Sequence, residues 1–399
     1  MDARRNDVNP QKYYVKKLCK IIYFMGLGDC WYERTEQSRM QKILYAIWAT
    51  LINSFIILNT INELLAFLRT DLSVKEKNDS IQFRFAHPCL CGKYIFLVLQ
   101  KHRIRALFER LLEASRSVYT VFEVEKRSVW QAKLCCLVLA ASSYCTLLFT
   151  VVDAIVGYFT QGIKIRTEVV LYPTPAHSGL LINLLRLLIE VHWWCIVTNM
   201  ILVDCLSSVA MVYVAHKLMI VKLYFQNLRQ KVISNIGKKS DLEIQKEYEM
   251  DFITGVKLHK DALWCAKNIQ YALGNVYSIQ VFESITLLGM CMVKMAKIDI
   301  NLTFILANGL YLVCVVIITG VYFSSAGNIT YEAYEVHNAM FHSGWELAHL
   351  SPASRAVVLV AIQRSQVPVF LTAFGVVVLS HNNFISVVRA SYSFFAVTY

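Results

Sequence analysis

Nine ionisable side chains lie within stretches of the sequence that are otherwise apolar. They are Glu63, Arg84, His87, Lys93, Asp153, Glu190, His192, Asp204 and Glu283. A charge at the centre of a bilayer costs roughly 2.5–3.5 kcal/mol on insertion scales, so each of these groups is a candidate for binding or ion chemistry. Glu63, Arg84 and Glu190 lie near the ends of their stretches, where lipid headgroups are within reach. We therefore expect Asp153, Asp204 and Glu283 to be the groups that face protein or water.

A second group of polar residues could bind a metal but lacks the required spacing. His337, His342, Glu346 and His349 lie close together in the sequence and match no zinc motif such as HExxH. The chain also has no Walker loop, no GxSxG elbow and no CxxC pair. The sequence therefore predicts no enzyme, no catalytic residue, no metal site and no cofactor.

Aromatic and small polar residues recur at helical spacing in several apolar stretches. The candidate ligand-binding residues are Phe85, Phe149, Asp153, Gly157, Trp193, Met200, Phe304, Asn308 and Tyr311. Such stripes are commonly core packing. The alternative is a small apolar pocket with a few polar groups, which would suit a hydrophobic volatile or a lipid-like ligand.

The apolar stretches themselves predict an all-α membrane protein of seven spans. They lie near residues 43–68, 81–100, 134–160, 187–215, 271–293, 300–324 and 366–397, and most reach the roughly 20 residues that cross a bilayer. A composition of 56% hydrophobic and 17% charged residues excludes an ordinary soluble domain. The first 42 residues are polar, so no cleavable signal peptide is expected.

The basic residues predict the orientation of these spans. With the N-terminus in the cytosol, 28 of the 40 Lys and Arg residues fall on the cytosolic side and 8 fall outside. This skew follows the positive-inside rule, so we expect a cytosolic N-terminus and an extracellular C-terminus. The net charge of +12 has the same origin and does not indicate nucleic-acid binding.

The predicted organisation divides the chain into six segments. These are a cytosolic N-terminal segment (1–42), spans one to four (43–215), a cytosolic loop with a helical extension (216–270), spans five and six (271–324), cytosolic anchor helices (325–365) and a final pore-lining region (366–399). Ser240 and Glu243 have the spacing of a capping box, and apolar residues then recur at helical intervals from Phe252. Ser351-Pro352 predicts the start of a short helix that ends before Pro368. These helical pieces with apolar faces imply an intracellular domain or a subunit interface.

The final apolar run has two readings. Polar residues around Asn382 leave a last helix from Phe384 to Tyr399, on which Ser386, Ala390, Ser393 and Val397 share one narrow face. Small residues at this spacing commonly mediate tight helix packing, and the same face could line a pore if repeated around a symmetry axis.

The number of spans also has an alternative. Residues 353–380 could cross the membrane as well, which would give eight spans, although Arg364 in that segment argues against it.

The end of the sequence resembles a known receptor family. Leu371-Thr372-Ala373, followed by Phe384 to Val397 with its Ser-Tyr-Ser-Phe-Phe core, is similar to the C-terminal signature of insect odorant receptors. Gustatory receptors usually end in Thr-Tyr, five apolar residues and Gln-Phe, which this chain lacks. The inverted seven-span layout extends the resemblance over the whole chain.

The resemblance implies a specific function. Members of this family form ligand-gated, non-selective cation channels as heterotetramers with a shared odorant co-receptor, in the plasma membrane of olfactory sensory neurons. It implies that Ser386, Ala390, Ser393 and Val397 line the pore for monovalent and divalent cations, and that a volatile ligand binds in the outer half of the bundle. The co-receptor has a longer loop than 216–270, so this chain resembles a tuning subunit. The alternatives are a G-protein-coupled chemoreceptor, which requires an outside N-terminus and motifs that are missing here, and a gustatory-type channel.

Overall fold

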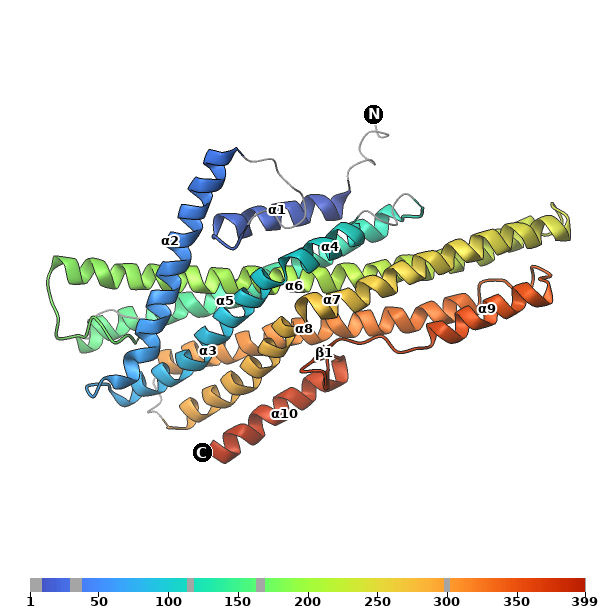
Figure 1. Ribbon diagram of the computed structural model, residues 1–399. Coiled ribbons are helices and arrows are strands. Elements are labelled where there is room, and N and C mark those ends of the chain that lie inside the picture. Colours follow the sequence, from blue (N-terminus) through green and yellow to red (C-terminus); the bar gives the residue numbers. More distant parts are fainter. Residues whose placement is uncertain (1–8, 29–37, 113–117, 163–168, 298–301, 399) are drawn as a thin grey trace.

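The protein is an elongated helical bundle in the computed structural model, which describes residues 9–28, 38–112, 118–162, 169–297 and 302–398 (Figure 1). The helices are α1 (Pro10–Phe24), α2 (Arg39–Leu64), α3 (Val74–Leu99), α4 (Lys101–Leu112), α5 (Phe122–Gln161), α6 (Leu180–Asn235), α7 (Asp241–Lys297), α8 (Leu302–Phe341), α9 (Pro352–Ser365) and α10 (His381–Thr398). A 3₁₀ turn, Leu65–Leu68, extends α2. Two short antiparallel strands, β1 (Thr372–Ala373) and β2 (Val377–Val378), precede α10.

Five of the described helices are long and apolar enough to cross a membrane, namely those in Arg39–Leu68, Phe122–Thr160, Leu180–Asn235, Asp241–Ala296 and Leu306–Phe341. The predicted second and seventh spans correspond to α3 and α10, which fall short of that measure. Charged residues such as Lys77 and Asp79 occupy the first half of α3, and α10 has 18 residues and contains Arg389. The all-α membrane fold is confirmed, and a bundle of this kind is a multi-pass membrane protein.

The helix α6 forms the centre of the bundle. It runs for 56 residues without a break, and 78% of its most apolar 18-residue stretch is buried, against 11% of the corresponding stretch of α2. A helix that is apolar on all sides packs stably only when other helices surround it, and α5, α7 and α8 do so here. The peripheral helix α2 crosses this group at a steep angle (Figure 1) and exposes residues such as Leu51 and Leu58, as a lipid-facing helix does.

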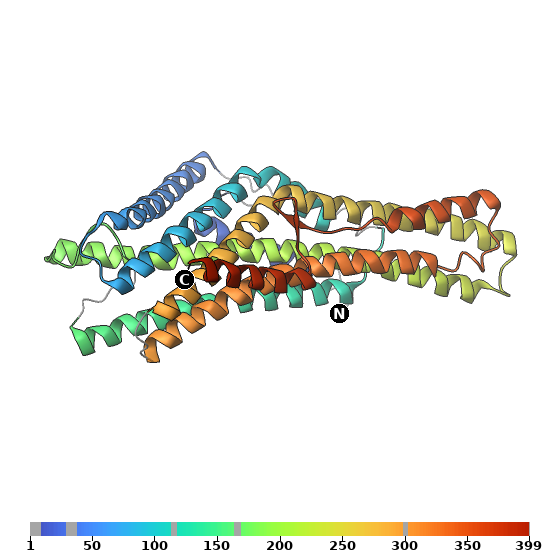
Figure 2. The ribbon, with the colours of Figure 1, turned by 90° about the horizontal axis from the view of Figure 1, so that it is seen from below.

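The segment 216–270 is a helical hairpin that extends α6 and α7 beyond the rest of the bundle. The sequence predicted the helix through Phe252 and its apolar stripe but not the matching continuation of α6 to Asn235. One half of the predicted capping box is present, because the Glu243 carboxylate accepts a hydrogen bond from the backbone N–H of Ser240; the Ser240 hydroxyl donates to the same carboxylate. With the end of α8 and with α9, this hairpin forms a rod that we call the extension (Figure 2).

The short helix α9 confirms a second sequence prediction. It begins after Ser351, whose hydroxyl accepts a hydrogen bond from the backbone N–H of Ser354, and it ends at Ser365, before Pro368. The chain then runs into the β1–β2 hairpin, so residues 353–380 form no single helix of membrane length. The eight-span reading therefore has no helix to support it.

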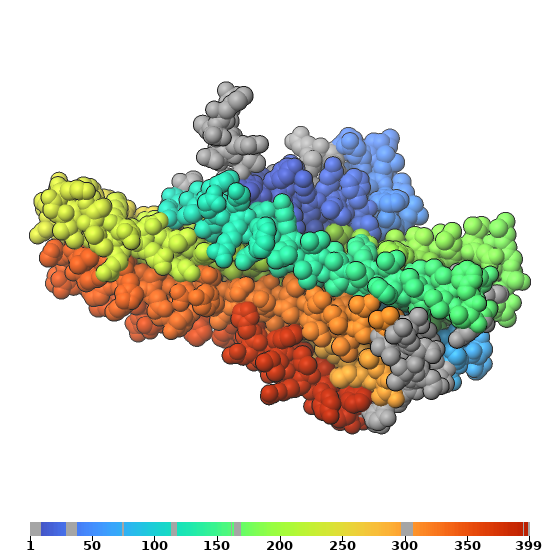
Figure 3. Space-filling view, turned by 180° about the vertical axis from the view of Figure 1, so that it is seen from behind, coloured from blue at the N-terminus to red at the C-terminus, as the bar shows by residue number. Residues whose placement is uncertain are grey.

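The last helix, α10, is anchored to α7 and α8. The Gln270 side chain donates to the carbonyl of Thr372 and accepts from its N–H, both at 2.9 Å, so the hairpin before α10 is tied to α7. Phe384 on α10 packs against Phe323 on α8, with ring centroids 6.2 Å apart. Seen from behind, α10 forms a ridge that stands off the body of the bundle (Figure 3).

Candidate functional site

A cavity of about 140 Å³ lies among α3, α5, α6, α7 and α8. Its walls are mostly apolar, and helical spacing explains which residues reach it: on α3 they recur at steps of three and four from Asp79 to Leu90. The other walls come from α5 between Ser143 and Asp153, from α6 between Trp193 and Met200, from α7 and from α8. A mostly apolar cavity with a few converging polar groups is the usual form of a small-molecule site.

The structure brings together five of the nine candidate ligand-binding residues. These are Asp153, Trp193, Met200, Asn308 and Tyr311, which come from α5, α6 and α8 and all line the cavity. Helical spacing in the sequence therefore selected residues of α6 and α8 that face this cavity.

Three other candidates do not line this cavity. Phe85 on α3 and Phe149 on α5 are 38% and 39% exposed. Each directly precedes a cavity-lining residue, Ala86 and Thr150, and adjacent residues of a helix point about 100° apart. Gly157 continues the cavity-facing line of α5 one turn beyond Asp153, where a Cβ would have no atom within 4 Å. The Phe304 side chain lies outside the described part of the structure.

The sequence missed several cavity residues on α3, above all Phe83 and His87. Both follow from the steps of three and four that begin at Asp79, a pattern that polar residues on α3 conceal. His87 lies against Glu63 of α2, whose carboxylate contacts the Nδ1 atom of the ring. Glu63 is only 2% exposed. The expectation that it reaches the headgroups is therefore wrong, because a partner on the neighbouring helix holds it inside the bundle.

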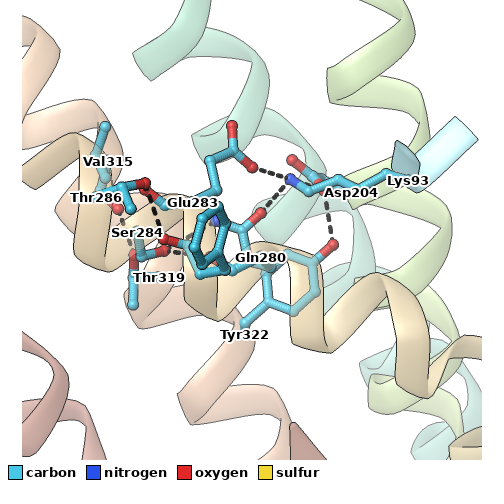
Figure 4. A network of polar contacts seen from close by, with 10 residues as sticks. Lys93, Asp204, Gln280, Glu283, Ser284, Thr286, Val315, Thr319 and Tyr322 are labelled. Atoms are coloured by element: carbon cyan, nitrogen blue, oxygen red, sulfur yellow. Dashed lines mark hydrogen bonds and ion pairs between the residues drawn. The ribbon is translucent and has the colours of Figure 1, made fainter. Parts of the chain in front are cut away.

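A network of buried charges lies at the inner wall of the cavity (Figure 4). The Lys93 ammonium is 2.7 Å from a Glu283 carboxylate oxygen and 3.3 Å from Asp204 Oδ1, and it also donates to the Gln280 side chain. All three charged side chains are at least 93% buried. The expectation that Asp204 and Glu283 face the protein interior is confirmed, and Lys93 is the counterion that the sequence did not assign to them.

Hydroxyl groups extend this network to α8. The Tyr322 hydroxyl donates to Asp204 Oδ1 at 2.6 Å, and the Thr319 hydroxyl donates to Ser284 Oγ at 2.7 Å. Polar side chains of four helices, α3, α6, α7 and α8, are therefore joined at one level of the bundle. Within the part of the chain that the structure describes, no group of His, Cys, Asp and Glu has the geometry of a metal site.

The candidate pore-lining residues share a face of α10 that the described part of the chain does not cover. Ser386, Ala390, Ser393 and Val397 are all exposed, and Val397 is 89% exposed. The helix packs on the bundle through other residues, including Phe384, Val387 and Ser391. A face that is left open in a single chain is available to neighbouring subunits.

Comparison with known proteins identifies the fold and the family. A family model described as "7tm Odorant receptor" matches residues 73–392. The chain belongs to the 7tm odorant receptor family. No curated protein sequence matches this odorant receptor.

Solved structures of an insect receptor share its architecture. The olfactory receptor OR5 from Machilis hrabei in complex with eugenol is similar with a TM-score of 0.79 at 13% identity, and 97% of each chain is covered. A second structure of the same receptor is similar with a TM-score of 0.78 at 14% identity, again over 97% of both chains. The cavity and the uncovered face of α10 are therefore features of an odorant receptor bundle.

Proposed function

We propose that this odorant receptor is the ligand-binding subunit of a ligand-gated, non-selective cation channel that assembles with the odorant co-receptor. The observation that carries the proposal is the mostly apolar cavity among α3, α5, α6, α7 and α8, together with a face of the last helix that the described part of the chain leaves uncovered. The first feature suits a small hydrophobic ligand, and the second suits a pore shared between subunits.

The proposed orientation has the N-terminus in the cytosol and the C-terminus outside. The skew of 28 basic residues against 8 supports it, and it directs the extension into the cytosol. The extension exposes apolar side chains such as Leu242, Met250 and Val360, whose burial between subunits would stabilise a tetramer. The receptor would then lie in the plasma membrane of olfactory sensory neurons.

The cavity size supports a short ligand. Its volume of about 140 Å³ is similar to that of an engineered apolar cavity of about 150 Å³ that takes up benzene. We infer that single-ring and short-chain volatiles fit and that a long-chain lipid does not. Asp153, Trp193, Met200, Asn308 and Tyr311 would contact such a ligand.

Channel opening requires that the ligand bind the open arrangement of the subunits better than the closed one. Ligand binding would act on α7 and α8, which line the cavity and also hold α10. Ser386, Ala390, Ser393 and Val397 would then line the path of monovalent and divalent cations.

Co-expression with the co-receptor tests the proposal. A panel of single-ring and short-chain volatiles should evoke cation currents that persist when G-protein signalling is blocked. Receptor or co-receptor expressed alone provides the control. Currents that disappear under the blockade would instead support a G-protein-coupled receptor, which would also require an epitope tag at residue 1 to be stained without permeabilisation.

A further inference from the structure

A buried carboxylate–imidazole pair lies at the edge of the cavity. Glu63 of α2 engages Nδ1 of His87 on α3, and the two side chains are 1% and 4% exposed. The His87 ring also lines the cavity and stacks on Phe83, with ring centroids 5.4 Å apart. Because Glu63 occupies Nδ1, Nε2 is the ring nitrogen left to meet a ligand.

The protons of this pair determine what Nε2 offers to a ligand. In one electrically neutral form, an imidazolium faces a carboxylate and Nε2 carries a hydrogen. In the other, protonated Glu63 donates to Nδ1 of a neutral ring, and the ring hydrogen is again on Nε2. A bare Nε2 requires one of two costly forms. An ionised carboxylate beside a neutral ring buries an uncompensated charge. A protonated Glu63 that accepts from Nδ1 leaves its own O–H without an acceptor, because the second carboxyl oxygen is buried and has no hydrogen-bond partner in the described part of the chain. Both neutral forms therefore present an N–H donor.

The charged groups around the pair do not alter this conclusion. The carboxylate of Glu283 interacts electrostatically with His87 and disfavours a further net negative charge beside it. His192 on α6 also interacts with His87, and Nε2 carries the hydrogen in either neutral form of the pair.

The other polar groups of the wall are largely engaged by the protein. The hydroxyls of Thr146 and Thr150 donate to carbonyls one turn earlier in α5. Glu283 is held by Lys93, and Asp79 is held by Lys294. In the described part of the chain, no protein acceptor binds Nε2 of His87.

We propose that His87, oriented by Glu63, is the residue that selects ligands by donating a hydrogen bond from Nε2 to an acceptor oxygen. The ligand class is a short or single-ring volatile with a carbonyl group, such as a ketone, an aldehyde or an ester. This inference rests on the proposed odorant-gated channel and adds a ligand class to it. A mostly apolar cavity with a donor of this kind discriminates by the presence of the acceptor, because a ligand without it leaves the N–H of His87 unpaired.

Matched ligand pairs test the selection in the unmodified receptor, co-expressed with the co-receptor. Acetophenone and α-methylstyrene have the same shape and differ by a carbonyl oxygen in place of a methylene group. The pair 2-heptanone and 2-methyl-1-heptene differs in the same way. We expect the ketone to act at a concentration about tenfold lower than its hydrocarbon partner in at least one pair. Equal potency within both pairs would overturn the proposal, whereas the absence of any volatile-evoked current would overturn the proposed channel function instead.

Variants test whether the His87 side chain causes the difference in potency between a ketone and its hydrocarbon partner. In His87→Leu the ratio of the two effective concentrations should fall to within about threefold of one, and in His87→Gln, whose amide can donate, it should remain. The ratio does not depend on the amount of receptor at the surface, so it separates ligand selection from poor folding. Phe83→Leu is the matched control, because it changes the same wall without removing a donor and should shift both ligands together. An unchanged ratio in His87→Leu, or a ratio lost in His87→Gln, would contradict the role of the Nε2 hydrogen.

Discussion

The membrane half of the bundle and the extension place their polar groups in opposite ways. In the membrane half, Lys93, Asp204 and Glu283 are buried among the helices, and apolar side chains such as Leu58 and Leu181 are exposed. In the extension, aromatic side chains such as Phe225 and Phe252 pack in the core and the ion pair Lys231–Asp251 lies on the surface, whereas the pair Lys217–Asp261 at its base is buried.

The difference reflects the surrounding solvent. Lipid cannot hydrogen-bond, so polar groups in a membrane bundle turn inward and find one another, whereas water solvates surface charges and drives apolar groups inward. Apolar side chains pack against α6 and α7 in both halves, but in the membrane half a network of almost fully buried charges also joins these helices. Variants in each half test this contrast.

The largest effect is expected from Lys93→Met in the membrane half. This change leaves Asp204 and Glu283 buried without their counterion, which costs roughly 3–5 kcal/mol. The purified receptor should lose most of its thermal stability in a detergent melting assay, and little of it should reach the cell surface.

A charge-free network is the control for this variant. Lys93→Met combined with Asp204→Asn and Glu283→Gln should recover most of the stability, because no unpaired charge remains. In the extension, Lys231→Met should change stability by less than about 1 kcal/mol, because Lys231 is 50% exposed. Similar losses for Lys93→Met and Lys231→Met would show that the two halves do not differ as described.

An intermediate loss of stability is expected at acidic pH, where His259 in the extension becomes protonated. Burial, together with the nearby positive charge of Arg364, lowers the pKa of His259 from 6.5 to about 4. The unfolded chain therefore binds a proton at a higher pH than the folded chain. The stability that this histidine contributes is complete above pH 6.5 and is lost as the pH falls toward 4, by up to about 3 kcal/mol.

Melting temperatures between pH 7.5 and pH 4.5 measure this loss. His259→Gln should flatten the acid branch of the curve, and His342→Gln, at an exposed position, should leave it unchanged. If both variants keep the acid branch of the unmodified receptor, the loss arises from groups other than His259.

The smallest effect is expected at Gly255, where α7 approaches α6. A Cβ at this position would lie 2.6 Å from Cζ of Phe225 and 2.9 Å from Cε1 of Tyr224. Alanine normally stabilises a helix by about 1 kcal/mol relative to glycine, but the clash costs about 1–3 kcal/mol. Gly255→Ala should therefore lower stability by about 1 kcal/mol in the same melting assay. Gly309→Ala, where a Cβ meets no atom within 4 Å, should not lower it.

The sequence predicted those parts of the fold that depend on local patterns. The Ser240–Glu243 contact, the apolar stripe from Phe252 and the start of α9 at Ser351 each rest on residues within a few positions of one another. Five of the nine candidate ligand-binding residues line the cavity for the same reason, since one helix face is a local pattern. Phe85 and Phe149 do not line it, because an aromatic residue in an apolar helix can face lipid as readily as a cavity.

The sequence alone determined that this protein is an all-α membrane bundle of the odorant receptor type. Hydropathy, charge bias and the C-terminal signature are all properties of the chain itself. The apolar stretches must cross the bilayer as helices in any fold that the chain adopts, because lipid cannot hydrogen-bond to an exposed backbone. The tertiary structure decided how the buried charges are paired. Lys93 meets Asp204 across 111 residues and His87 meets Glu63 across 24, and such pairings depend on which helix faces pack together. For that reason the ligand-selecting donor that we propose at His87 could be found only after the helices were placed.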